Sequence, residues 1–107
     1  MKIVLEKDIT DTRLILLEGD MGTGKTSFTK TLVSLFNPDI IVSSPTYSYM
    51  NEYHIDENFT IWHYDLYRCE KNIPFCDIYD QIHSQKGIVV IEWPEKFPDL
   101  YNFQWTL

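Results

Sequence analysis

The chain contains little arginine and few clustered basic residues. Two arginines, Arg13 and Arg68, stand among nine basic residues in 107, against sixteen acidic residues, and the formal net charge is −7. Proteins that bind nucleic acid alone draw most of their affinity from neutralising phosphates with grouped basic side chains. Because no lysine cluster offsets the acidic excess, the composition indicates that this protein does not bind nucleic acid tightly without a partner.

Cysteine and long hydrophobic runs are also scarce. Cys69 and Cys76 lack the Cys-x-x-Cys spacing, and with three scattered histidines they form no recognisable zinc motif. They are typical of reduced thiols in a cytosolic protein. No run approaches the length that crosses a bilayer, and the N-terminal MKIVLEKD has no apolar signal segment. We therefore expect a cytoplasmic protein with no membrane partner.

The pattern of apolar residues predicts one domain over residues 1–107, since no repeat or linker divides the chain. Residues 14–17 form a continuous apolar run before a glycine-rich turn, which is typical of a buried parallel strand. Residues 27–36 place apolar side chains at helical spacing and stop before Pro38.

The second half of the chain predicts further strands and one helix. Residues 40–42 form a short apolar strand pattern, and residues 47–54 and 59–67 alternate around a polar turn like a hairpin. Residues 73–84 are predicted to be helical in part, and residues 87–92 repeat the buried-strand pattern and end on an acid. This order of elements predicts an α/β fold.

Between the first predicted strand and helix, residues 19–26 read GDMGTGKT and match G-x-x-x-x-G-K-[ST] in full. The glycines let backbone N–H groups approach phosphate oxygens, and the positive end of the following helix faces the same anion. Lys25 is expected to reach the β- and γ-phosphates, and the Thr26 hydroxyl to bind Mg²⁺. The flanking strand and helix make a chance glycine turn the weaker interpretation.

This match refines the fold class to a P-loop NTPase: a small three-layer α/β sandwich with a mostly parallel central sheet. The residues predicted to bind the nucleotide belong to one loop and the start of its helix. They are Met21, Gly22, Thr23, Gly24, Lys25 and Thr26.

A phosphate loop needs a second acid near the metal, usually at the end of another apolar strand. Asp65 and Glu92 both end such runs, and either could equally be a solvated acid, so the residues alone leave the metal ligand open. His63 projects to the same strand face as Asp65. A histidine–aspartate metal pair is one interpretation, but a structural histidine is favoured because no further residue with ligand spacing joins them.

The residues indicate only the general class of nucleotide that is bound and of reaction that is catalysed. No N-K-x-D element for reading guanine occurs, which favours ATP. Small-molecule kinases share the loop, but they add a lid with several arginines that clamps the transferred phosphoryl group. Two arginines leave little for such a lid. The residues thus predict a small ATPase or an ATP-driven switch.

Four stretches in order resemble the bacterial TsaE (YjeE) family of ATPases, which act in tRNA threonylcarbamoyladenosine biosynthesis. They are GDMGTGKTSF at 19–28, SSPTYS at 43–48, HYDLYR at 63–68 and VVIEWPE at 89–95. Only the first is specific by itself, but the ordered set is specific and spans most of the chain.

The resemblance implies roles for individual residues. Thr46 would be a switch residue that senses the γ-phosphate, Glu92 would share Mg²⁺ with Thr26, and Asp65 would orient or activate the attacking water. Trp93 would pack near the nucleotide and exclude water. The predicted catalytic residues are therefore Lys25, Thr46 and Asp65.

The resemblance further implies ATP and Mg²⁺ as cofactors and a partner complex of the TsaD and TsaB proteins. That complex modifies the adenosine beside the anticodon, so this chain would bind tRNA indirectly, through the complex. Tyr67 and Arg68 would contact a partner or tRNA. Two alternatives stay open: a non-catalytic module that docks on the same complex, and a small-molecule kinase. The docking module is considered because family members have further elements ahead of the first core strand, here Leu14, and after residue 95. The fold of this chain could therefore lack terminal elements of the family.

Overall fold

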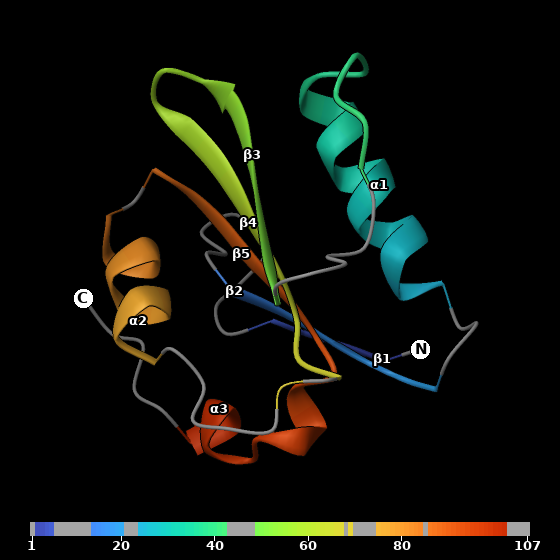
Figure 1. The fold of residues 1–107 in the computed structure, drawn as a ribbon, viewed down its shortest axis with the longest axis vertical. Helices are drawn as coiled ribbons and strands as arrows, with labels where there is room; N and C mark the ends of the chain where they lie inside the picture. Colours follow the sequence, from blue (N-terminus) through green and yellow to red (C-terminus); the bar gives the residue numbers. More distant parts are fainter. Residues whose placement is uncertain are drawn as a thin grey trace.

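The computed structural model describes residues 2–5, 14–20, 24–42, 49–67, 69, 75–84 and 86–102. The strands and helices within these ranges are β1 (Lys2–Leu5), β2 (Leu14–Glu18), α1 (Lys25–Phe36), β3 (Met50–Asp56), β4 (Phe59–Asp65), α2 (Phe75–His83), β5 (Gly87–Glu92) and α3 (Asp99–Asn102), with a 3₁₀ turn at Pro94–Lys96. The described part of the chain is thus an α/β fold (Figure 1).

The strands form one sheet in the order β1-β2-β5-β4-β3. The three inner strands β2, β5 and β4 are parallel, whereas β1 pairs with β2 and β3 pairs with β4 in antiparallel fashion. The prediction of a mostly parallel sheet therefore holds for the centre only, and the sheet as a whole is mixed. The physical reason at one edge is the short turn between Asp56 and Phe59, which can join only antiparallel neighbours.

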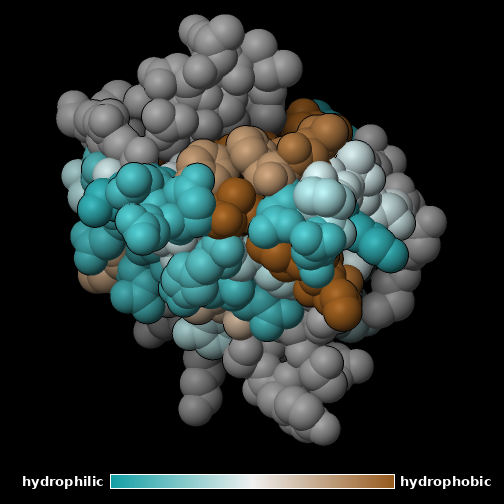
Figure 2. Space-filling view, turned by 90° about the horizontal axis from the view of Figure 1, so that it is seen from above, coloured by the Kyte–Doolittle hydropathy of each residue, from teal (hydrophilic) through white to brown (hydrophobic). Residues whose placement is uncertain are grey.

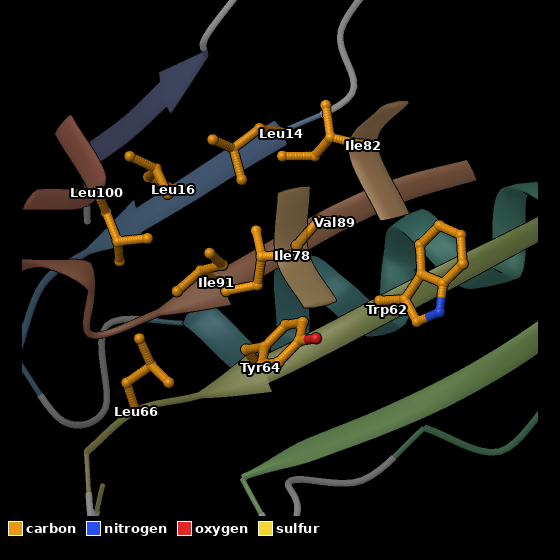
Figure 3. Close-up of a cluster of buried hydrophobic side chains, with 10 residues drawn as sticks. All are labelled: Leu14, Leu16, Trp62, Tyr64, Leu66, Ile78, Ile82, Val89, Ile91 and Leu100. Carbon is orange, nitrogen blue, oxygen red and sulfur yellow. The ribbon is translucent and has the colours of Figure 1, made fainter. Parts of the chain in front are cut away.

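Helices cover both faces of the sheet, as the three-layer prediction requires. Figure 1 shows α1 on one side, with α2 and α3 on the other. Because side chains alternate along a strand, the two faces build two cores. One holds Leu14, Leu16, Trp62, Tyr64, Leu66, Ile78, Ile82, Val89, Ile91 and Leu100 (Figure 3). The other, under α1, holds Ile15, Leu17, Val33, Val42, Tyr53, Ile61 and Val90.

Helix α1 connects the sheet to the predicted phosphate loop. Its buried side chains are Lys25, Thr29 and Val33, which recur every four residues and so lie on one face. The helix ends where the backbone N–H of Asn37 donates to the carbonyl of Val33 at 2.9 Å, directly before Pro38. The predicted helix is confirmed, and it begins two residues earlier than residue 27.

Two expectations about strands differ from the structure. Residues 40–42 do not form a strand: Ile41 is 89% exposed, and the side chain of Asn37 accepts a hydrogen bond from the N–H of Asp39, which turns the chain. In contrast, β1 was not anticipated. Its four residues are too few to show a strand pattern, and its place depends on pairing with β2.

The surface over the β3–β4 turn and the end of α1 is mostly hydrophilic, with hydrophobic groups between (Figure 2). Leu35 and Phe36 are exposed large hydrophobic residues at the end of α1. The ring of Phe36 stacks on Phe59 with the centroids 4.8 Å apart, which ties this helix end to the start of β4. None of the helices described has the length and apolar character to cross a bilayer.

Tyr64 gives the fold a measurable dependence on alkaline pH. Its buried hydroxyl donates to Oε1 of Gln81 at 2.8 Å, and burial raises the pKa of Tyr64 to about 12. In the unfolded chain the hydroxyl ionises near about pH 10. Stability that is fully present below pH 10 is therefore lost as the pH rises through 12, because only the unfolded chain releases the proton in that window.

We expect Tyr64→Phe to reduce this alkaline loss, measured as the difference in the free energy of unfolding between pH 9 and pH 11.5. Burial also raises the pKa of Tyr101, so part of the loss should remain in the variant. A loss as large in Tyr64→Phe as in the unchanged protein would show that Tyr64 does not titrate as described.

Candidate functional site

The carboxyl ends of the three parallel strands meet at one edge of the sheet, where α1 begins. Gly19 follows β2, Glu92 ends β5 and Asp65 ends β4. In the ladder, Glu92 lies opposite Leu17 on one side and Asp65 on the other. Ligands of open α/β sheets bind outside the carboxyl ends of the strands, so this edge is the candidate site.

The start of α1 is built to face an anion. Gly24 precedes the helix with φ of 93°, a left-handed conformation that glycine adopts at no steric cost. Gly24 has no side chain with which to cap the helix, and the first turn carries no acidic residue. The positive end of the helix dipole is therefore not compensated by an acid of its own first turn. Met21, Gly22 and Thr23, the middle of the predicted loop, lie outside the described residues.

Lys25 is buried although it carries a charge, with 5% of its surface exposed. Its Nζ donates to the carbonyl of Gly19 and lies 3.4 Å from the centroid of the Trp93 ring. A cation over an indole face is stabilised by about 0.5–2 kcal/mol. Within the described ranges no carboxylate forms a salt bridge with Lys25. The ammonium group is therefore held by a carbonyl and a ring, and its charge remains available to an anionic ligand.

Thr26 and Glu92 approach each other across the gap between α1 and β5. Oγ1 of Thr26 lies 3.4 Å from both Oε1 and Oε2 of Glu92. Glu92 is 3% exposed. A buried carboxylate is costly unless it is paired or binds a metal, and here a hydroxyl and a histidine face it.

The donor set of Thr26 and Glu92 fits Mg²⁺. Two oxygens that bind one octahedral Mg²⁺ at about 2.1 Å lie about 3 Å apart, which is close to the 3.4 Å separation observed. Within the described residues, no group of three or more histidine, cysteine, aspartate or glutamate side chains could hold a metal. Mg²⁺ commonly takes only one or two protein ligands together with substrate phosphates. The pair could therefore hold Mg²⁺ together with a phosphate ligand.

His63 contacts Glu92 and not Asp65. Its ring is completely buried, and Nε2 is hydrogen-bonded to Oε2 of Glu92. The ring also lies 6.5 Å from that of Tyr53, centroid to centroid. The sequence analysis favoured a structural histidine over a metal pair with Asp65, and it did not consider Glu92 because the sequence does not show that β4 and β5 are neighbours. The role of His63 beside Glu92 was missed.

Asp65 shares the α1 face of the sheet with His63 and Glu92, by the alternation of side chains along β4. Its Oδ1 accepts a hydrogen bond from the N–H of Tyr67 at 3.1 Å, and its own N–H donates to the carbonyl of Tyr49 at 2.8 Å. The carboxylate is thus placed at the strand ends, partly exposed, beside Glu92. Thr46 and Arg68 lie outside the described residues.

Trp93 directly follows Glu92 in a left-handed conformation with φ of 62°. This conformation costs a residue other than glycine about 1–2 kcal/mol, and such strain is often found at functional sites. The ring is in contact with Nζ of Lys25, and the centroid of the Tyr67 ring is 4.9 Å away. Nζ of Lys96 in turn lies 5.4 Å from the Tyr67 ring centroid and donates to the carbonyl of the same residue. Pairwise contacts therefore connect the buried Lys25 with the exposed Tyr67 and Lys96.

The amino-acid sequence of this chain is similar to those of known proteins over most of its length. The family model described as threonylcarbamoyl adenosine biosynthesis protein TsaE matches residues 2–106. Three relatives carry the name tRNA threonylcarbamoyladenosine biosynthesis protein TsaE. The protein from Nostoc sp. is 38% identical over 90% of this chain and 61% of its own length. That from Rickettsia conorii is 34% identical over 86% and 53%, respectively. That from Bacillus subtilis is 36% identical over 75% and 49%.

The chain thus spans about half to three-fifths of the length of these relatives. The family model nevertheless covers nearly every residue of the chain, including all four stretches that carried the resemblance. The chain therefore belongs to the TsaE family.

Proposed function

We propose that the chain is a Mg²⁺-dependent ATPase that drives threonylcarbamoyl modification of the adenosine beside the tRNA anticodon, acting with the TsaD and TsaB proteins. One observation carries the proposal most strongly. At the start of the helix after the glycine turn, Oγ1 of Thr26 lies 3.4 Å from both carboxylate oxygens of Glu92, next to the buried Lys25. A hydroxyl, an acid and a lysine in this arrangement are the protein groups that P-loop NTPases use for Mg·nucleotide.

The roles of these residues follow from their positions. Lys25 would leave the Trp93 ring and bind the β- and γ-phosphates, since a phosphate attracts the ammonium group more strongly than an indole face does. The backbone of residues 21–26 would supply further N–H donors at the positive end of α1. Thr26 and Glu92 would hold Mg²⁺, which when bound neutralises charge on the phosphates and orients them.

Asp65 and Thr46 would complete the reaction. Asp65 lies beside Glu92 at the strand ends, partly exposed, where its carboxylate could orient or activate the attacking water. Thr46 would sense the γ-phosphate as a switch residue. Trp93, held next to Lys25, would cover the nucleotide and exclude bulk water.

The acidic charge supports a division of labour with the partners. With a formal net charge of −7, the chain is poorly suited to attract tRNA by itself. Tyr67 is 40% exposed and its ring packs against Trp93 at a tilt of 47°, so it offers the partners a surface contact adjacent to the nucleotide site. RNA contact would then fall mainly to TsaD and TsaB, with Arg68, the next residue in the sequence, as a further contact to a partner or to tRNA.

Hydrolysis of ATP with and without the TsaD–TsaB pair tests the proposal. We expect turnover that rises on adding the pair and that falls by about 10²–10⁴-fold in Asp65→Asn, the range over which a positioned acid or base acts. The matched control is Asp56→Asn. Asp56 is an exposed acid at the end of the antiparallel strand β3, opposite Phe59 at the start of β4, so it lies at the other end of β4 from Asp65. Its Oδ1 accepts from the N–H of Asn58, and an amide oxygen can replace it.

If Asp65→Asn and Asp56→Asn had the same turnover as the unchanged chain, Asp65 would have no part in hydrolysis. Binding to the TsaD–TsaB pair without any turnover would favour the docking module. Phosphate transfer to a small acceptor would favour the kinase.

A further inference from the structure

His63 and Glu92 form a buried polar contact whose contribution to the protein needs an explanation. His63 is 0% exposed and Glu92 is 3% exposed, so both polar side chains have been removed from water. Burying two such groups costs free energy that their attraction repays only when the geometry is good. A hydrophobic pair at these positions would often be at least as stable. The pair is therefore not readily explained by a contribution to the stability of the fold, and it points instead to a function at Glu92.

The ring of His63 is held in place by the elements on either side of β4. On the β3 side it lies 6.5 Å from the Tyr53 ring, with 27° between the planes. On the β5 side its backbone is opposite Val90, and its side chain reaches along the strand to Glu92. The ring therefore comes from a rigid inner strand and not from a loop, which favours precise positioning.

The hydrogen bonding of the ring is directed at Glu92 alone in the part of the chain that the structure describes. Nε2 binds Oε2 of Glu92, and Nδ1 has no hydrogen-bond partner among those residues. A carboxylate that binds a metal is ionised and only accepts hydrogen bonds, so Nε2 of His63 is then the donor. The sole polar bond of this ring thus goes to the acid that we assign to Mg²⁺.

We propose that His63 is a positioning residue that sets the orientation of the Glu92 carboxylate in the Mg²⁺ site. Oε1 and Oε2 both lie 3.4 Å from Oγ1 of Thr26, so Thr26 alone does not select one of them. The bond from His63 occupies Oε2 and leaves Oε1 for the metal. This inference rests on the proposed function, since it needs a Mg·nucleotide site at Thr26 and Glu92.

Hydrogen-bonding partners of metal ligands generally change metal affinity or activity by about 10–100-fold when removed. In the full chain, we therefore expect His63→Phe to raise the Mg²⁺ concentration needed for half-maximal Mg-dependent ATP binding by about 10–100-fold. ATP binding in the presence of a chelator should stay within a few-fold of the unchanged chain, because Lys25 and the start of α1 are untouched. This second readout separates a Mg²⁺ effect from general damage.

Two amides supply the matched pair. The amide nitrogen of glutamine reaches about as far as Nε2 of histidine, whereas that of asparagine reaches only as far as Nδ1. His63→Gln should therefore restore most of the Mg²⁺ affinity, and His63→Asn should not. Ile61→Val, two residues earlier on the same buried face and without a polar group, controls for a loss of stability in β4. It should leave the Mg²⁺ requirement unchanged.

The outcomes distinguish a failure of the role assigned to His63 from a failure of the proposed function. Weakening in His63→Phe and His63→Asn with recovery in His63→Gln supports the inference. A Mg²⁺ requirement in His63→Phe equal to that of the unchanged chain overturns it, as does an equal weakening in Ile61→Val. If His63→Phe fails to unfold cooperatively, the Gln and Asn variants decide the question. An unchanged chain that binds ATP with no dependence on Mg²⁺ would overturn the proposed function itself.

Discussion

Lys25→Ala should abolish most of the affinity for Mg·ATP. Nζ of Lys25 is a buried cation at the start of α1, and it is held there by the carbonyl of Gly19 and the Trp93 ring. Removal of one partner of a buried, hydrogen-bonded charge pair costs about 2–5 kcal/mol. We therefore expect the Kd for Mg·ATP to rise by about 30-fold to several thousand-fold, measured by titration calorimetry.

Lys30→Ala is the matched control for this loss. Lys30 lies on α1 about 1.4 turns further along, is exposed, and carries the same charge. The control removes one positive charge from the acidic chain without touching the strand ends, so its Kd should stay within a few-fold of the unchanged value. Equal losses in the two variants would mean that Lys25 contributes only through long-range charge. No loss in Lys25→Ala would contradict the assignment of the loop.

Gly87→Ala should destabilise the fold severely. Gly87 begins β5, the central strand, and lies opposite Thr60 of β4. A Cβ on Gly87 would lie 1.7 Å from the carbonyl oxygen of Thr60 and 2.8 Å from the ring of Trp62. The nearer atom belongs to the backbone and can move only if β4 and β5 separate. We expect the free energy of unfolding to fall by about 3 kcal/mol or more, measured by denaturant titration.

Gly24→Ala is the comparison that separates a clash from backbone strain. Among the residues that the structure describes, a Cβ on Gly24 would meet no atom within 4 Å, but its φ of +93° is unfavourable for alanine. The expected cost there is about 1–2 kcal/mol. If Gly87→Ala cost no more than Gly24→Ala, β4 and β5 would not pack as closely at this point as the structure places them.

Much of the fold could be predicted from local patterns. The runs that became β2 and β5 are continuously apolar because inner strands are covered on both faces, and the β3–β4 hairpin alternates because β3 lies at an edge. The short strand β1 depends on pairing with β2, and the turn at residues 37–40 depends on the Asn37 side chain and carbonyl. Neither leaves a periodic signal, so sequence patterns missed β1 and predicted a strand at residues 40–42 that does not form.

The candidate site shows the same division. The loop motif predicted Lys25 and Thr26 as site residues. The strongly apolar run that ends on an acid predicted Glu92 as one of two possible metal ligands. Local pattern could not choose between Glu92 and Asp65, because the choice depends on which strand lies next to which. The structure places Glu92 within 3.4 Å of Thr26 and buries His63 against it. Sequence distance hides that contact, since 29 residues separate His63 from Glu92.

The most direct test of the central claim is a crystal structure of the chain with Mg²⁺ and a non-hydrolysable ATP analogue. We predict the triphosphate at the start of α1, with Nζ of Lys25 on its phosphates instead of on the Trp93 ring. We also predict Mg²⁺ at about 2.1 Å from Oγ1 of Thr26, with Glu92 bound directly or through one water. A nucleotide bound elsewhere, or a bound nucleotide with Lys25 still on Trp93 and no metal beside Thr26, would contradict the proposed site.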